Sequence, residues 1–320
     1  MELLPVGTKF NFMGKSKIAF VFSALLIAMS VWVWIDRGQS KYGIDYAGGY
    51  EIIASIPGEV STNDLRKLLK KKGVKEAVVQ SFEVGSEEYA IRIPIDSGLS
   101  EDGGAEATNQ VRGTVASVIQ EAFGESASIV GTDYVGPTIS EELKEKAVTA
   151  VIVGLLGILG YITVRFEFAF ALGAVAALFH DVIVCMGIYL ITGKTLTMAT
   201  LAGALTIVGY SVNDTIIVFD RIREEFLRGR KLSIPDLMNL SINLTLSRTV
   251  ITSLLTLFSA VALLVFGGGA IVDLSLFLVI GVIAGTYSTI FIASPVALAW
   301  EEFRARSEEK GSNTATSAVL

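Results

Sequence analysis

Six long apolar runs constrain this chain more than any other feature of its sequence. Each has roughly the 20 residues that a helix needs to cross the ~30 Å hydrocarbon core of a bilayer. Because a backbone inside hydrocarbon must satisfy its own hydrogen bonds, such runs predict transmembrane α-helices. The runs are 18–35, 147–164, 168–191, 196–219, 249–272 and 274–300. The fold predicted for residues 18–35 and 147–300 is therefore a membrane α-helical bundle of six transmembrane helices.

The first run also has some features of a signal peptide, because three lysines between positions 9 and 17 precede it. It is long for the apolar part of such a peptide, and residues 31–34 (VWVW) are a poor cleavage site. Tryptophans are instead enriched at membrane interfaces. We therefore expect residues 18–35 to remain in the membrane as the first helix.

The distribution of lysine and arginine predicts the orientation of the spans. Basic residues are frequent before the first run, in 220–231 and in 301–306, whereas 192–195 contains only Lys194 and 267–273 contains none. Both termini, residues 1–17 and 301–320, are thus expected to be cytoplasmic. Small polar residues near the end predict that the tail is disordered. Residues 36–146 would then be extracytoplasmic.

The extracytoplasmic segment has the length of one small domain. Its apolar residues alternate as in β-strands in four places, and two stretches have helical spacing. The predicted order is β-α-β-β-α-β, as in ferredoxin-like α+β domains. Two helices would cover one face of the sheet, and the other face either receives a partner or belongs to a simple spacer. The strands are expected at 50–56, 76–84, 89–95 and 127–135, with a turn at 85–86, the helices at 61–73 and 105–123, and a helical lead-in to the second span at 140–146.

An acidic residue, Asp214, lies inside the fourth apolar run. An ionised carboxylate at the bilayer centre costs about 3 kcal/mol on insertion scales. Such a group is retained where it is paired, protonated or used. Asp214 is therefore predicted to take part in moving a proton or an ion.

Four more polar residues lie in the membrane runs or at their ends. Asn213 precedes Asp214, His180 and Asp181 lie in the third run, and Arg248 is at the start of the fifth. At ~1.5 Å per residue, Asp214 and Arg248 would reach similar depths, with Asp181 deeper. Burial favours a neutral carboxyl and a nearby guanidinium favours a charged one, so small movements of such a pair could switch its proton.

Structural roles remain open for the same residues. Arg248 could extend to the lipid headgroups instead, as basic residues near helix ends commonly do. His180 and Asp181 form either a proton relay or a mutually satisfied pair between helices. Glycines in the runs, including Gly281 and Gly285 in a G-x-x-x-G pattern, predict close helix packing.

Composition argues against several other functions. The net charge of −6 gives no support to nucleic-acid binding. One cysteine and one histidine make a zinc cluster or a Cys–His catalytic pair unconvincing. Gly193, Lys194 and Thr195 resemble the end of a phosphate-binding loop, but Ile188 occupies the position of its first glycine. No enzymatic activity, cofactor or metal is predicted.

Several motifs together resemble those of the SecD/SecF family, and in particular of its SecF members, the smaller subunits of a bacterial membrane complex. The resemblance covers about residues 15–300. The family motif after the first span commonly has Phe and Thr where Tyr46 and Ala47 stand. The matching segments are 43–49 (GIDYAGG), 135–137 (VGP), 180–181 (HD), 209–215 (GYSVNDT), 218–224 (VFDRIRE), 246–249 (LSRT) and 251–253 (ITS).

The resemblance implies a fold and a function. The chain would be half of a twelve-helix unit related to RND transporters, located in the bacterial cytoplasmic (inner) membrane. With SecD it would use the proton-motive force to help complete protein export through the SecYEG channel, without being an enzyme. Further implied partners are YajC and the exported unfolded polypeptide. Asp214 would be the proton-coupling acid and Arg248 its partner, Asn213, Asp181 and His180 would support them, and Gly43, Asp45, Gly48 and Gly49 would form the family motif at the base of the extracytoplasmic domain.

Two other functions remain as alternatives. An RND-like proton-driven exporter of lipids or small molecules would need a large apolar pocket in its external domain, and a domain of about 100 residues is small for that. A purely structural subunit would use its polar residues only to hold helices together. The sequence leaves open whether SecD is a separate chain.

Overall fold

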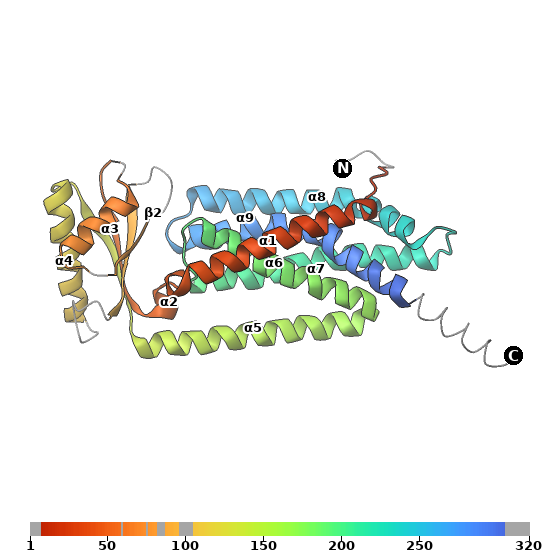
Figure 1. Ribbon diagram of the computed structural model, residues 1–320, viewed down its shortest axis with the longest axis horizontal. Coiled ribbons are helices and arrows are strands. Elements are labelled where there is room, and N and C mark those ends of the chain that lie inside the picture. The colour runs from red at the N-terminus through yellow and green to blue at the C-terminus, as the bar shows by residue number, and fades with distance from the viewer. Residues whose placement is uncertain (1–7, 59, 75, 82–86, 96–104, 305–320) are drawn as a thin grey trace.

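The computed structural model describes residues 8–58, 60–74, 76–81, 87–95 and 105–304. A long helical bundle carries a small sheet domain at one end (Figure 1). Within the described residues, six helices are long and apolar enough to cross a membrane, one for each predicted run. The predicted fold class, a six-helix membrane bundle with an α+β ferredoxin-like domain, is confirmed.

Most helices of the bundle are longer than the apolar runs that predicted them, and the third coincides with its run, 168–191. In particular, the lead-in at 140–146 and the second span form one helix. A short 3₁₀ turn, η1 (Met13–Lys15), precedes the first helix, and the last helix continues through a π-helical turn, η4 (Thr289–Ala293), to Arg304. The bundle helices are α1 (Ser16–Asp36), α5 (Pro137–Arg165), α6 (Phe168–Ile191), α7 (Met198–Leu227), α8 (Ile234–Phe266) and α9 (Ala270–Ser288).

Two expectations near the C-terminus need correction. The fifth helix stops at Phe266 rather than at Val272, because three glycines follow and Gly269 has a positive φ of 51°. Residues 301–304, expected in a disordered tail, are helical, and the rings of Trp300 and Phe303 lie 6.0 Å apart there. The remainder of that tail, 305–320, and the expected turn at 85–86 lie outside the described residues.

The sheet domain has the predicted β-α-β-β-α-β order. Its four strands are antiparallel in the order β2-β3-β1-β4, so the central β1 pairs with both β3 and β4. Alternate residues of β1, such as Ile52 and Ala54, are fully buried with Leu65 and Val115 from the two covering helices. The elements are β1 (Gly49–Ser55), α3 (Thr62–Lys71), β2 (Val78–Ser81), β3 (Glu88–Ile93), α4 (Ala105–Phe123) and β4 (Ser128–Val135).

The uncovered face of the sheet turns toward the membrane helices. Helices α3 and α4 lie on the side of the sheet away from the bundle (Figure 1). On the bundle side, the amide of Gln80 in β2 donates to the carbonyl of Gly193 in the loop between α6 and α7. The face that could have received a partner therefore contacts a membrane loop of the same chain.

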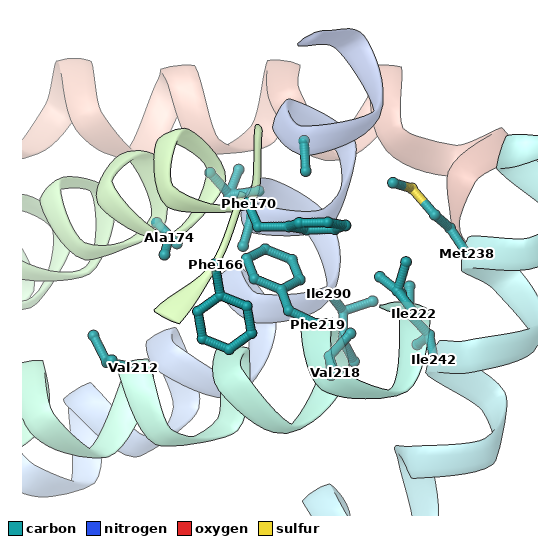
Figure 2. Packing of buried hydrophobic residues seen from close by; sticks show 14 of the residues in the cluster. Phe166, Phe170, Ala174, Val212, Val218, Phe219, Ile222, Met238, Ile242 and Ile290 are labelled. Carbon is teal, nitrogen blue, oxygen red and sulfur yellow. The ribbon is translucent and has the colours of Figure 1, made fainter. Parts of the chain in front are cut away.

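The end of the bundle far from the sheet domain contains a large apolar cluster. Phe219 of α7 lies between Phe166 and Phe170 (Figure 2), with ring centroids 6.3 and 4.9 Å away. Met238 and Ile242 bring the first turns of α8 into the same cluster. Residues 235–247, which precede the fifth apolar run, are thus the packed beginning of α8.

Glycines set the spacing of α9 and α6 against their neighbours. A Cβ on Gly281 would collide with Ile207 of α7, and one on Gly173 of α6 would collide with the carbonyl of Ala293. The predicted close contact at the G-x-x-x-G pattern is therefore present. The π-helical turn η4 is followed closely by Pro295, whose ring and missing N–H disturb the regular α-helical bonding.

Candidate functional site

A buried polar seam runs between α6, α7 and α9, and Asp181 is its best-connected member. Ser211 of α7 donates to Asp181 Oδ2 at 2.6 Å, and Ser288 of α9 donates to the same oxygen at 2.7 Å. The other oxygen, Oδ1, lies 3.0 Å from His180 Nδ1. Asp181 is 1% exposed, so three helices meet at one hydrogen-bonded carboxyl group.

His180 connects this group toward α1. Its ring stacks at a tilt on Tyr287, with centroids 5.9 Å apart. Tyr287 donates to the carbonyl of Ala19 at 2.9 Å, and its hydroxyl lies 3.0 Å from that of Ser23. His180 Nε2 is buried and has no hydrogen-bond partner within the described ranges. The predicted pair of His180 and Asp181 is therefore in direct contact and belongs to a wider network.

Asp214 lies almost one helical turn further along α7 from Ser211. It is also 1% exposed, and protein rather than lipid surrounds it. Its Oδ2 atom is buried and accepts no hydrogen bond from any described residue. The neighbouring Thr215 hydroxyl is 3.0 Å from that of Thr289, at the start of the π-helical turn. Asp214 thus sits beside a hydrogen-bonded contact of α7 and α9 without sharing in it.

Arg248 approaches Asp214 but does not pair with it. The two charges are close enough to interact electrostatically, yet Arg248 forms no ion pair within 4.0 Å with any residue that the structure describes. Its exposed side chain lines a cavity of about 440 Å³ with Asp220 and Glu224. The two residues are brought near one another, as the depth estimate predicts, and a gap remains between them.

Asn213 faces away from this seam. It is exposed on the outside of the bundle, because on a helix adjacent residues point in directions about 100° apart. Its expected contact with the Asp214 site is not formed in this chain. Across the described ranges, no three His, Cys, Asp or Glu side chains gather in a way that could hold a metal ion.

The glycine-rich motif lies at the base of the sheet domain, where a short helix, α2 (Ile44–Ala47), follows the 3₁₀ turn η2 (Gly38–Lys41). Asp45 Oδ2 accepts a hydrogen bond from the backbone N–H of Met198 at 2.8 Å. A Cβ on Gly43 would come 2.8 Å from Thr197. Gly48 and Gly49 have φ values of 72° and 125°, which favour glycine. The four motif residues therefore fix α2 between β1 and the start of α7.

Tyr46 of α2 extends toward the same helix start. Its hydroxyl donates to the carbonyl of Thr197 and lies near the sulfur of Met198, both at 3.4 Å. Burial raises the pKa of Tyr46 to about 12, and the nearby Asp45 charge adds to this rise. Tyr46 therefore remains a neutral hydrogen-bond donor at neutral pH.

Comparison with known proteins places the chain in one family. The family model described as "Protein export membrane protein SecD/SecF, C-terminal" matches residues 114–303, more than half of the chain. The chain belongs to the SecD/SecF family. Among its relatives are the protein translocase subunits SecF of Rickettsia bellii and Calditerrivibrio nitroreducens, both 38% identical. These matches cover 92% and 96% of this chain, and 95% and 99% of the relatives.

Two solved SecDF structures resemble this fold. The crystal structure of SecDF from Thermus thermophilus, a translocon-associated membrane protein, has a TM-score of 0.81 and 37% identity over 94% of this chain. SecDF in the super-membrane-facing form has a TM-score of 0.68 and 36% identity over 97% of this chain. The chain spans only 40% and 41% of those SecDF chains. It is a multi-pass integral membrane member of the SecD/SecF family.

Some residues of the site in this SecD/SecF family member were not singled out from its sequence. Ser211 and Ser288 look like ordinary small residues in apolar runs, and no local signal distinguishes them. Glu225 is fully buried at the end of α7 and is held by Arg221, Arg228 and Arg230 at 2.9, 2.9 and 2.8 Å. The spacing of Arg221 and Arg228 at four and three residues from Glu225 is a helix-pair signal that could have identified it.

Proposed function

We propose that this chain couples the proton-motive force to Sec-dependent protein export, acting with SecD at the SecYEG channel. Membership of the SecD/SecF family supports the export role, and the site supports proton coupling. The observation that carries the coupling is Asp214, a carboxyl group buried among helices with one oxygen unpartnered. Keeping such a group charged costs free energy, so its presence is best explained by a function in which it gains and loses a proton.

The geometry suggests how a proton would act. Neutral Asp214 has no need of a cation, and Arg248 can then stay in its cavity beside Asp220 and Glu224. Ionised Asp214 would attract the guanidinium and draw α8 toward α7. A proton crossing the membrane supplies about 2.3 kcal/mol per 100 mV, and this energy would drive the shift. The Asp181 network would hold α6, α7 and α9 together meanwhile.

The proposed orientation places both termini in the cytoplasm and the sheet domain outside. The start of α1 and the end of the last helix lie at the end of the bundle opposite the sheet domain (Figure 1). The arginine-rich end of α7 lies there too, which agrees with the preference of basic residues for the cytoplasmic side. In a bacterium this membrane would be the cytoplasmic (inner) membrane. SecD would supply the other half of the twelve-helix unit, a share of SecDF that this chain does not span.

Export of a reporter protein into inverted membrane vesicles tests this proposal. Wild type and Asp214→Asn are compared with and without a proton gradient. We expect the gradient to accelerate export in wild type and to have no effect in Asp214→Asn. Asp236→Asn is the matched control, because it is the same change at an exposed residue of α8 that does not line the cavity of Arg248. Equal stimulation in Asp214→Asn and wild type would refute the coupling role.

One observation fits the alternative of an RND-like exporter of lipids or small molecules. A largely apolar cavity of about 940 Å³ lies between the sheet domain and the helices, lined by residues such as Trp34, Ile93 and Leu201. This volume suits a small ligand. Copurification separates the two functions: SecD and channel subunits support export, whereas a periplasmic or outer-membrane adaptor supports the alternative.

A further inference from the structure

Helix α7, which carries Asp214, is attached at its first residue to the base of the sheet domain. The backbone N–H of Met198 donates to Asp45 Oδ2 at 2.8 Å. Just before α7, the N–H of Gly43 donates to the carbonyl of Leu196, and the N–H of Leu196 donates to the carbonyl of Lys41, both at 2.7 Å. These contacts join segments that are more than 150 residues apart in the sequence.

The attachment continues into the sheet without a flexible linker. Helix α2 ends at Ala47, and Gly49 already begins β1. A Cβ on Gly49 would lie 2.5 Å from the carbonyl of Ile93, so β1 starts in tight contact with β3. Gly49 is also paired with Val135 at the end of β4, which leads directly into α5. A displacement of α2 must therefore displace β1.

The bond from Asp45 meets a specific need of α7. The first N–H groups of a helix have no partner within it, and an acidic oxygen is favoured there by the helix dipole. The first turn of α7 contains no acidic residue of its own. The side chain of Thr197 accepts from the backbone N–H of Thr200, not from that of Met198. Asp45 supplies the missing acceptor from the sheet domain.

We propose that Asp45 is a positioning residue that transmits movement of α7 to the extracytoplasmic domain. The inference rests on the proposed proton-coupling function and adds the route by which a change at Asp214 reaches the outside. Asp214 lies 16 residues after Met198 on one continuous helix, about 24 Å along its axis. Since an α-helix is stiff over that distance, a shift at Asp214 moves Met198, and Asp45 moves with it.

Two variants remove this bond from opposite sides. Asp45→Ala removes the acceptor. Met198→Pro removes the donor, and proline is well tolerated at the first residue of a helix. The preceding Thr197 has φ −128° and ψ 176°, the extended conformation that a following proline requires. Met198→Leu changes the same side chain but keeps the N–H, and Asp45→Asn keeps an oxygen that can accept. Asp36→Ala is a control at an exposed acid on the same side.

The measurement is a distance between spin labels on the sheet domain and on α8, the helix against which α7 moves in the proposed cycle, in the full chain in membrane vesicles. Labels at Asp133→Cys of the sheet domain and Ser259→Cys of α8 occupy exposed positions, and Cys185 is buried, so a Cys185→Ala background leaves only these two. In the otherwise wild-type chain we expect the distance distribution to shift when Asp214→Asn replaces the ionisable acid. We expect the same shift with Asp45→Asn, Met198→Leu and Asp36→Ala, and none with Asp45→Ala or Met198→Pro.

Each other outcome counts against the inference. An unchanged shift in Asp45→Ala and Met198→Pro shows that the bond does not transmit movement. Loss of the shift in Asp45→Asn contradicts the role of Asp45 as a hydrogen-bond acceptor. Loss of the shift in Met198→Leu shows that the Met198 side chain, and not its N–H, is responsible. Absence of any shift in the wild-type background means there is no movement to transmit. The vesicle export assay with Asp214→Asn then shows separately whether the proposed function has failed.

Discussion

Asp181 and Asp214 are two carboxyl groups of the same bundle. They are equally buried, at 1% exposure, but they differ in how fully their oxygens are hydrogen-bonded. Asp181 accepts from two serines and contacts a histidine. Asp214 has an oxygen with no partner among the described residues and an arginine near it that is not paired. Burial alone therefore does not identify which carboxyl group takes part in proton coupling.

The contrast teaches which group can change state. A carboxyl group whose oxygens are occupied loses hydrogen bonds whenever it moves or changes charge, and buried donors left without acceptors are costly. A carboxyl group with an oxygen that accepts no hydrogen bond loses few hydrogen bonds when it moves or changes charge. We infer that Asp181 is the fixed point of the seam and that Asp214 is the group free to respond.

The largest expected effect on stability distinguishes these two acids directly. Asp181→Ala leaves Ser211, Ser288 and His180 without their shared acceptor, and we expect a loss of about 3 kcal/mol or more. Asp214→Ala removes a poorly satisfied group, and we expect a change below about 1 kcal/mol. Thermal unfolding in detergent checks both. Equal losses in the two variants would remove the distinction between them.

A smaller effect is expected from pushing apart the helices that hold the seam. Gly281→Ala places a methyl group against Ile207 of α7, and overpacking of this kind costs about 1–3 kcal/mol. Gly209→Ala on α7 is the matched control, because nothing lies within 4 Å of its Cβ position. We expect the first variant to unfold at a lower temperature and the second to be neutral or slightly stabilised. The reverse order would contradict the packing described here.

The smallest effect on stability is expected at Arg248. Its side chain is exposed and has no ion pair with a described residue, so Arg248→Gln should change stability by less than about 0.5 kcal/mol. The same variant should lose the export stimulated by the gradient, and Arg248→Lys should retain part of it. Thermal unfolding and vesicle export of the same preparations separate the two effects. Arg223→Gln, at another exposed position, is the control for loss of a charge.

Most of the architecture could be predicted from patterns along the chain. Apolar runs gave the six helices, and alternation gave the sheet domain, because both depend on local periodicity. Helix ends were predicted less well where a glycine cluster or an amphipathic segment decided the boundary, as at Phe266 and in residues 235–247.

The site could be predicted only in part. The cost of a charge in hydrocarbon singled out Asp214, and the structure places its side chain in the protein interior. The partners of Asp181 come from α7 and α9, and the acceptor for Met198 comes from a residue 153 positions earlier. Those contacts depend on how distant helices rotate against one another, which no local pattern specifies.

The central claim is that Asp214 is the carboxyl group that takes up and releases a proton in the proposed cycle. Infrared difference spectroscopy of the membrane-embedded chain across a pH titration detects the C=O stretch of a protonated carboxyl group. Because Asp214 Oδ2 accepts no hydrogen bond from a described residue, we predict a titrating component at the high frequency of a non-hydrogen-bonded carboxyl group. This component should persist in Asp181→Asn and disappear in Asp214→Asn. A band that persists in Asp214→Asn and disappears in Asp181→Asn would contradict the account.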